Sequence, residues 1–274
     1  MTELLNAWPI GVALIATGMF AGILAGLLGV GGGIVIVPVL YFLLQGFGVS
    51  AASAMAIATA TSLATIVPTA ISSIRAHHRK GNVDVELLKF WGGIILVAAI
   101  GGSLLASSVS GNFLTWMFGI IALLVSLNML FRSGAPALFN QLPGKLGQAM
   151  MATSVGGLSV MIGIGGGTIG VPLLTSFNVA AHRAVGTAAA FGLLIALPGV
   201  LTLLVVGETP IDAPIGTWGL VNIPAFLFII PLTILFAPVG AKIGAKLNPQ
   251  QLKKAFAIVL FFTGARMLIQ VVGA

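Results

Sequence analysis

Two runs of three glycines are the part of this sequence best suited to binding a solute. Residues 29–40 read GVGGGIVIVPVL and residues 163–174 read GIGGGTIGVPLL, and in both copies a proline follows the glycines at the same spacing. A helix that restarts after such a break presents unpaired N–H groups and about half a positive charge. Because glycine has no side chain, an anion can approach this backbone closely. We therefore expect a substrate site built from Gly31, Gly32, Gly33, Pro38, Gly165, Gly166, Gly167 and Pro172.

A plainer interpretation is that the glycines only allow two helices to pack closely, as small residues spaced four apart do in membranes. Three consecutive glycines exceed what packing needs, and each costs about 1 kcal/mol in a helix interior. The freed backbone groups are also costly in lipid unless they are buried in protein or line a cavity. These costs favour the binding interpretation.

Hydroxyl and guanidinium groups extend the candidate site. Thr61, Ser62 and Thr187 lie in the apolar segments that follow the glycine runs. Their hydroxyls can bond an oxyanion, or bond a carbonyl of their own helix or a neighbouring helix. Arg183 and Arg266 lie near the ends of later segments. Each can attract an anion or anchor its segment at the membrane interface.

The sequence offers little chemistry for catalysis. It has no Cys, and its five carboxylates and three His fall in loops, at segment ends or at the terminus. A nucleophile, a base or a metal cluster within an apolar segment is therefore not visible. We expect no catalytic residue, no metal and no cofactor, and we predict that the chain is not an enzyme. An intramembrane enzyme is the remote alternative.

The composition indicates what kind of molecule holds these residues. Of 274 residues, 58% are hydrophobic and 6% charged, and the mean hydropathy is +1.17. Soluble domains carry about 25% charged residues. A soluble enzyme, a disordered chain and a nucleic-acid-binding domain are therefore excluded, and the expected partner is the lipid bilayer.

The apolar stretches predict an all-α, polytopic transmembrane helix bundle. A spanning helix needs about 20 apolar residues, and each half of the chain has five apolar segments. The second segment of each half is too short to span and is expected to be a broken or re-entrant helix. The segments are about 8–29, 34–44, 51–74, 88–107 and 113–131 in the first half, and about 146–164, 169–177, 184–206, 217–239 and 252–272 in the second.

The two halves repeat each other. The glycine motifs are offset by 134 residues, and Ala58-Thr59-Ala60-Thr61 resembles Ala184-Val185-Gly186-Thr187 further along. We predict a first transmembrane repeat over residues 1–135, a cytoplasmic linker over 136–145 and a second repeat over 146–274.

Basic residues predict that the repeats are inverted. The stretch between the third and fourth segments of the first half holds Arg75, Arg79, Lys80 and Lys89, whereas the matching stretch 207–216 holds no Lys or Arg. Since Lys and Arg concentrate in cytoplasmic loops, the two stretches should lie on opposite sides of the membrane. Both termini then lie outside a plasma or inner membrane. Inverted repeats of this kind are common among secondary transporters.

The sequence resembles the TauE/SafE family of membrane proteins, often called sulfite exporters. The resemblance rests on GVGGGIVIVP and GIGGGTIGVP, on Ala184 to Thr187, on the basic stretch from His77 to Asp84 and on the ending from Gly240 to Leu268. It implies a secondary transporter that exports small sulfur-containing anions such as sulfite or sulfonates. Alternating access would then occur around a midplane site formed by the two glycine-rich helix starts. The alternatives are an anion channel or a carrier for small carboxylates, and an oligomer is possible.

Overall fold

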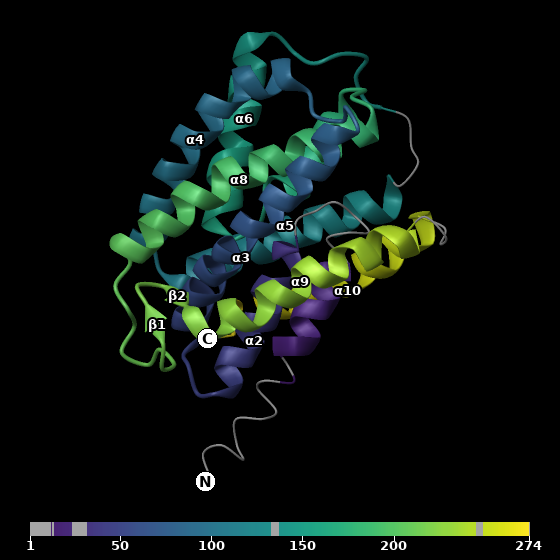
Figure 1. The fold of residues 1–274 in the computed structure, drawn as a ribbon. Helices are drawn as coiled ribbons and strands as arrows, with labels where there is room; N and C mark the ends of the chain where they lie inside the picture. Colours follow the sequence, from purple (N-terminus) through teal and green to yellow (C-terminus); the bar gives the residue numbers. More distant parts are fainter. Residues whose placement is uncertain (1–11, 13, 24–31, 133–136, 245–248, 274) are drawn as a thin grey trace.

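Long apolar runs satisfy their backbone hydrogen bonds within helices, and most of these runs that the structure describes form helices (Figure 1). The computed structural model describes residues 12, 14–23, 32–132, 137–244 and 249–273. Within this part the chain is almost entirely helical, with a single short β-hairpin, which confirms the all-α prediction. Four helices, α3, α4, α5 and α8, are long and apolar enough to cross a membrane.

The helix bounds follow the expected segments closely. The described part of the first half contains a helix over Leu14–Ile23, then α2 (Gly33–Gly46), α3 (Ala51–Arg79), α4 (Val85–Ser108) and α5 (Gly111–Phe131). The second half contains α6 (Lys145–Met161), α7 (Gly166–Ser176), α8 (Ala181–Val205), β1 (Thr217–Trp218), β2 (Val221–Asn222), α9 (Ile223–Gly244) and α10 (Pro249–Val272).

The helices α3 and α8 pack against each other in the interior, and the short helices α2 and α7 each pack on one of them. Helix α4 lies along α6 and α8, and α10 lies along α5. Glycines allow the closest of these contacts. A Cβ atom on Gly156 of α6 would lie 2.7 Å from the Ile95 carbonyl of α4, and one on Gly22 would lie 2.9 Å from Thr233 Cα of α9. Many large hydrophobic side chains remain exposed on α4, α5 and α10, as lipid contact requires.

Helices α6 and α7 form a helical hairpin. The amides of Leu138 and Phe139, in the stretch just before α6 begins, donate to the carbonyl of Ser176 at the end of α7, at 2.9 and 3.0 Å. The Phe139 ring also stacks on Phe177 with 4.6 Å between centroids. The end of α7 therefore returns to the side on which α6 starts.

Two boundaries differ from the sequence expectation. Helix α3 continues to Arg79, so that His77 and His78 are helical rather than in a loop. The ninth segment does not begin as a helix at Thr217, because Gly216 and Gly219 adopt φ values of +83° and +54° and support a hairpin turn. Helix α9 starts only after Asn222, whose side chain caps it.

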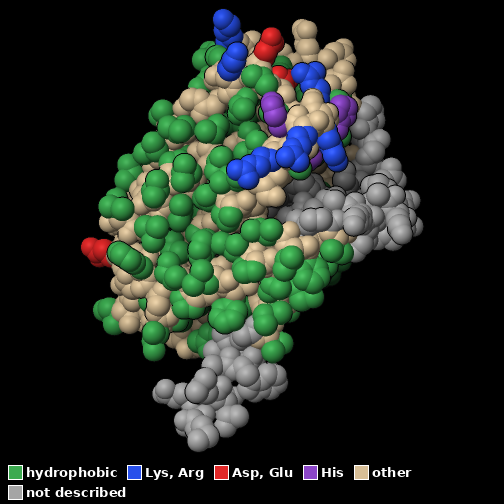
Figure 2. All heavy atoms as spheres, viewed as in Figure 1, with side chains coloured by type: hydrophobic (Ala, Val, Ile, Leu, Met, Phe, Trp, Pro, Cys, Tyr) green, Lys and Arg blue, Asp and Glu red, His purple; other side chains and the backbone are tan. Residues whose placement is uncertain are grey.

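Charge divides the bundle into two ends. We call the end where α3 finishes and α4, α6 and α8 begin the basic end. It carries Arg79, Lys80, Lys89, Lys145 and Arg183. Figure 2 shows Lys and Arg side chains gathered in the upper part of the molecule, above a broad hydrophobic surface. We call the end with the β1–β2 hairpin, where α8 finishes and α3 begins, the hairpin end. The inverted orientation of the halves, their boundaries and the sides on which the termini lie stay predictions.

Candidate functional site

The second glycine run breaks the chain between α6 and α7. Helix α6 ends in a Schellman motif. The Gly163 amide donates to the Val160 carbonyl at 3.3 Å, and the Ile164 amide donates to the Ser159 carbonyl at 3.0 Å. This ending places a left-handed residue after the helix, and Gly163 fills that position with φ +72°. Helix α7 restarts at Gly166, with Gly165 as its N-cap.

The first glycine run leads into the start of α2, where the cap has a different conformation from the extended Gly165. Gly32 is the N-cap with φ +71°, and its carbonyl accepts the amide of Ile36 at 3.1 Å. Pro38 lies inside α2 and Pro172 inside α7. Because proline has no amide hydrogen, each removes one hydrogen bond from the early turns of its helix. Gly31 lies outside the described residues.

The start of α2 and the break between α6 and α7 meet inside the protein. A Cβ atom on Gly33 would lie only 2.9 Å from the carbonyl oxygen of Gly163. The Ser62 hydroxyl of α3 donates to the same carbonyl at 2.7 Å. The start of α2 is therefore in direct contact with the break of the other half, and Ser62 ties the two together.

Each helix start also packs on the third helix of its own half. Gly33 lies against Ser62 and Ile66 of α3, and Gly166 lies against Ala188 and Gly192 of α8. Ser62 corresponds to Ala188 and Ile66 corresponds to Gly192, at the same offset of 126 residues that relates Thr61 to Thr187. Gly33, Gly166 and Gly167 are all buried. The backbone groups freed by the breaks are thus enclosed by protein rather than lipid.

Three buried hydroxyls around the second break have no hydrogen-bond partner in the part of the chain that the structure describes. They belong to Thr59, Ser159 and Thr168, each at most 1% exposed. Thr168 is in the first turn of α7, the Ser159 carbonyl accepts from Ile164, and the Thr59 backbone lies against Gly163. An unpartnered buried hydroxyl costs about 1–3 kcal/mol, so these three hydroxyls are candidate donors to a bound polar group.

Sequence reasoning missed these three residues as candidates. The available signals were the position of Thr168 directly after the glycine run and the presence of Thr59 in the stretch that repeats at Thr187.

Thr61 and Thr187 form matching contacts between the halves, which we call the crossed caps. The Asp84 amide donates to the Thr187 hydroxyl at 2.9 Å, while the Asp84 side chain accepts from the Leu87 amide and caps α4. The Asn222 amide donates to the Thr61 hydroxyl at 2.9 Å, while the Asn222 side chain accepts from Ala225 in the first turn of α9. Each cap thus joins the start of one helix to the third helix of the other half.

Charged groups strengthen the contact at both ends. At the basic end, Arg183 and Asp84 form an ion pair at 2.7 Å. At the hairpin end, the Asp212 side chain accepts from the Ser50 amide at 2.7 Å, next to the start of α3. Hydrogen bonds from the Ser53 side chain and from Ser50 lower the pKa of Asp212 to about 2. This stabilisation is present above the ordinary aspartate pKa near 4 and is lost as the pH falls toward 2.

The structure does not bring Arg266 to the glycine breaks. Its guanidinium lies 4.4 Å from the centroid of the Phe42 ring. Phe42 is nine residues beyond Gly33 along α2, a distance of about 14 Å at 1.5 Å per residue. Arg183 likewise lies at the basic end and not at the breaks.

The comparisons with known proteins agree with this architecture. Residues 14–267 match the family model described as "Sulfite exporter TauE/SafE". The chain belongs to the TauE/SafE family. It is therefore a membrane protein and a membrane transporter, as the resemblance implied. No solved structure matches it significantly.

Curated relatives of this TauE/SafE chain carry similar descriptions. A probable membrane transporter protein of Haemophilus influenzae is 30% identical over 92% of this chain and 96% of its own length. One from Methanocaldococcus jannaschii is 29% identical over 93% and 94% of the two chains. One from Bacillus subtilis is 27% identical over 94% and 97%. The similarity thus spans both halves of the chain.

Gly166→Ala tests the close packing of the second break. The new Cβ would lie 2.6 Å from Phe191 Cβ and 3.0 Å from the Gly192 amide nitrogen, and such overpacking costs about 1–3 kcal/mol. We expect a clearly lower thermal-unfolding midpoint in detergent. The matched control is Gly170→Ala on the same helix, whose Cβ would find its nearest neighbour at 3.5 Å. Equal midpoints for the two variants would contradict the packing described here.

Proposed function

We propose that this TauE/SafE protein is a secondary transporter that exports small anions, with sulfur-containing oxyanions such as sulfite or organosulfonates as its substrates. The observation that carries the proposal is the meeting of the two glycine breaks, at Gly33 and Gly163, in the protein interior. The substrate site comprises the predicted glycines and prolines, together with the hydroxyls of Thr61, Ser62 and Thr187.

Electrostatics favour an anion at this position. Each helix start contributes about half a positive charge and several free N–H groups, and these act strongly where water is excluded. None of the described carboxylates lies in a helix interior near the breaks, since Asp84, Glu86, Glu208 and Asp212 are all in loops or first turns. The unpartnered hydroxyls of Thr59, Ser159 and Thr168 can donate to an oxyanion.

Sulfite and sulfonates suit such a set of donors because three oxygens share their negative charge, and each oxygen can accept more than one hydrogen bond. The name of the family, which refers to sulfite export, supports the same substrate class. Small carboxylates present a related but flatter acceptor and are the alternative substrate class.

The crossed caps support alternating access. Each cap fastens a loop from one half over the third helix of the other half, and the two caps lie toward opposite ends of the bundle. Releasing the Asp84 loop from Thr187 opens the basic end, and releasing Asn222 from Thr61 opens the hairpin end. Each release also frees a threonine hydroxyl for the solute. Two matched closures of this kind are what an inverted-repeat transporter requires.

Flux in proteoliposomes tests the substrate class. The purified chain should move sulfite and short alkyl sulfonates faster than neutral solutes of the same size, and acetate tests the carboxylate alternative. A preference for neutral or cationic solutes would refute the proposal. Single-channel currents would instead identify the protein as an anion channel.

Thr168→Val tests whether the anion binds at the second break. The variant keeps the shape of the side chain but removes a buried donor, so we expect the KM for sulfite to rise about fivefold or more, as loss of a hydrogen bond to a charged group predicts. The matched control is Thr175→Val on the same helix, whose hydroxyl donates to its own helix at Val171. Equal KM values for the wild type and Thr168→Val would exclude this residue from the site.

Cysteine accessibility tests the two closures, because the natural chain has no Cys. Ala64 and Ala190 are buried alanines three residues beyond Thr61 and Thr187. Asp84→Asn removes the ion pair with Arg183, and we expect it to raise maleimide labelling of Ala190→Cys from the basic end about two- to fivefold.

A variant at the hairpin end serves as the control for the side from which labelling rises. Asp212→Asn should raise labelling of Ala64→Cys from the hairpin end and leave Ala190→Cys unchanged. Labelling that rises at both cysteines from one side, or at neither, would contradict separate closures at the two ends.

A further inference from the structure

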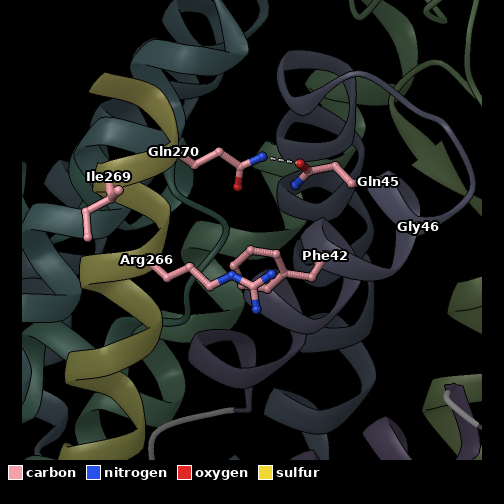
Figure 3. A pocket seen from close by; sticks show the side chains of 6 residues that line it. All are labelled: Phe42, Gln45, Gly46, Arg266, Ile269 and Gln270. Atoms are coloured by element: carbon pink, nitrogen blue, oxygen red, sulfur yellow. Dashed lines mark hydrogen bonds between the residues drawn. The ribbon is translucent and has the colours of Figure 1, made fainter. Parts of the chain in front are cut away.

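A second polar site lies away from the glycine breaks. A pocket of about 490 Å³ opens between the C-terminal part of α2 and the last turns of α10 (Figure 3). It is lined by Phe42, Gln45, Gly46, Arg266, Ile269 and Gln270. Figure 3 shows Arg266 extended from α10 across the Phe42 ring, with the Gln45 and Gln270 side chains facing each other above it.

Arg266 has a fixed orientation but no opposite charge. Its guanidinium lies 4.4 Å from the centroid of the Phe42 ring, a cation–π contact that orders the side chain. Arg266 forms no ion pair with a carboxylate of the described residues. Lys254, at the start of α10, lies twelve residues before Arg266 and is therefore about 18 Å away along the helix.

Two side-chain amides add hydrogen-bond donors beside this charge. Gln270 Nε2 donates to Gln45 Oε1, which links α10 to α2. Gln45 Nε2 donates to the Tyr41 carbonyl at 3.2 Å. Each amide nitrogen carries two hydrogens, and each of these bonds uses one of them.

The surroundings place this charge at the border of the lipid. Phe262, Ile269 and Val272 of α10 are highly exposed apolar side chains, as expected of a lipid-facing helix surface, and Arg266 lies less than two turns before the end of α10. A guanidinium beside lipid-facing side chains is stabilised by an anionic partner.

We propose that the pocket binds an oxyanion, held by the Arg266 guanidinium and by the side-chain amides of Gln45 and Gln270. The shared chemistry is a phosphate-like group with several acceptor oxygens, which matches the planar fork of donors on arginine. It is supplied by a phospholipid headgroup or by a soluble anion. This site is separate from the substrate site at the breaks, and its test does not require transport.

Thermal unfolding of the full chain in neutral detergent tests the site. The protein is titrated separately with dioleoylphosphatidylglycerol and with inorganic phosphate at constant ionic strength, since a ligand that binds the folded state raises the unfolding midpoint. We expect a saturable rise with at least one probe. A rise with the lipid alone identifies a headgroup site, and a rise with phosphate as well identifies a site open to soluble anions.

Three variants connect the rise to this pocket. Arg266→Gln should increase the half-saturating concentration about tenfold or more, as loss of a charge-assisted contact predicts. Phe42→Leu keeps the charge but removes the ring, and should increase it about two- to fivefold. Lys89→Gln, an exposed basic residue of α4 at the basic end, should leave it unchanged.

The proposal is overturned if neither probe stabilises the wild type. It is also overturned if Lys89→Gln weakens binding as much as Arg266→Gln. If Arg266→Gln does not fold, Phe42→Leu decides, because unchanged binding in that variant contradicts the site.

Discussion

Backbone groups that lose their helical partners inside an apolar bilayer must be enclosed by protein, and this requirement governs the arrangement of the whole chain. The break at Gly163 is covered by Thr59 and Ser62 of α3 and by the start of α2. The restart at Gly166 is covered by α8. At the contact of Gly33 with Gly163, the described residues of the two halves shelter each other's backbone.

Local features of the sequence predicted most of the fold. Apolar runs of about 20 residues have few alternatives to a helix in a membrane, and most of the expected segments coincide with observed helices to within a few residues. The glycine runs marked the breaks because three consecutive glycines weaken a helix, and Gly163, two residues before the second run, supplies the left-handed residue that ends α6. The binding role of these glycines stays a prediction.

Contacts between distant residues could not be predicted in this way. The crossed caps join Asp84 to Thr187 and Thr61 to Asn222, and residues more than 100 positions apart leave no local pattern that relates them. The hairpin before α9 was missed for a different reason, since Thr217 to Asn222 reads as part of an apolar run, and the turn depends on the conformations of Gly216 and Gly219. Thr59, Ser159 and Thr168 stand out only once their burial is known.

The crossed caps are alike in geometry but not in charge. Asp84 is ionic and pairs with Arg183, whereas Asn222 is neutral, and Ile57 occupies the position in α3 that corresponds to Arg183 in α8. Dissolved salt screens a partly exposed ion pair but leaves a neutral amide bond almost untouched. Rising ionic strength therefore weakens the Arg183–Asp84 ion pair beside the Thr187 cap, whereas the neutral hydrogen bond between Asn222 and Thr61 stays almost unchanged.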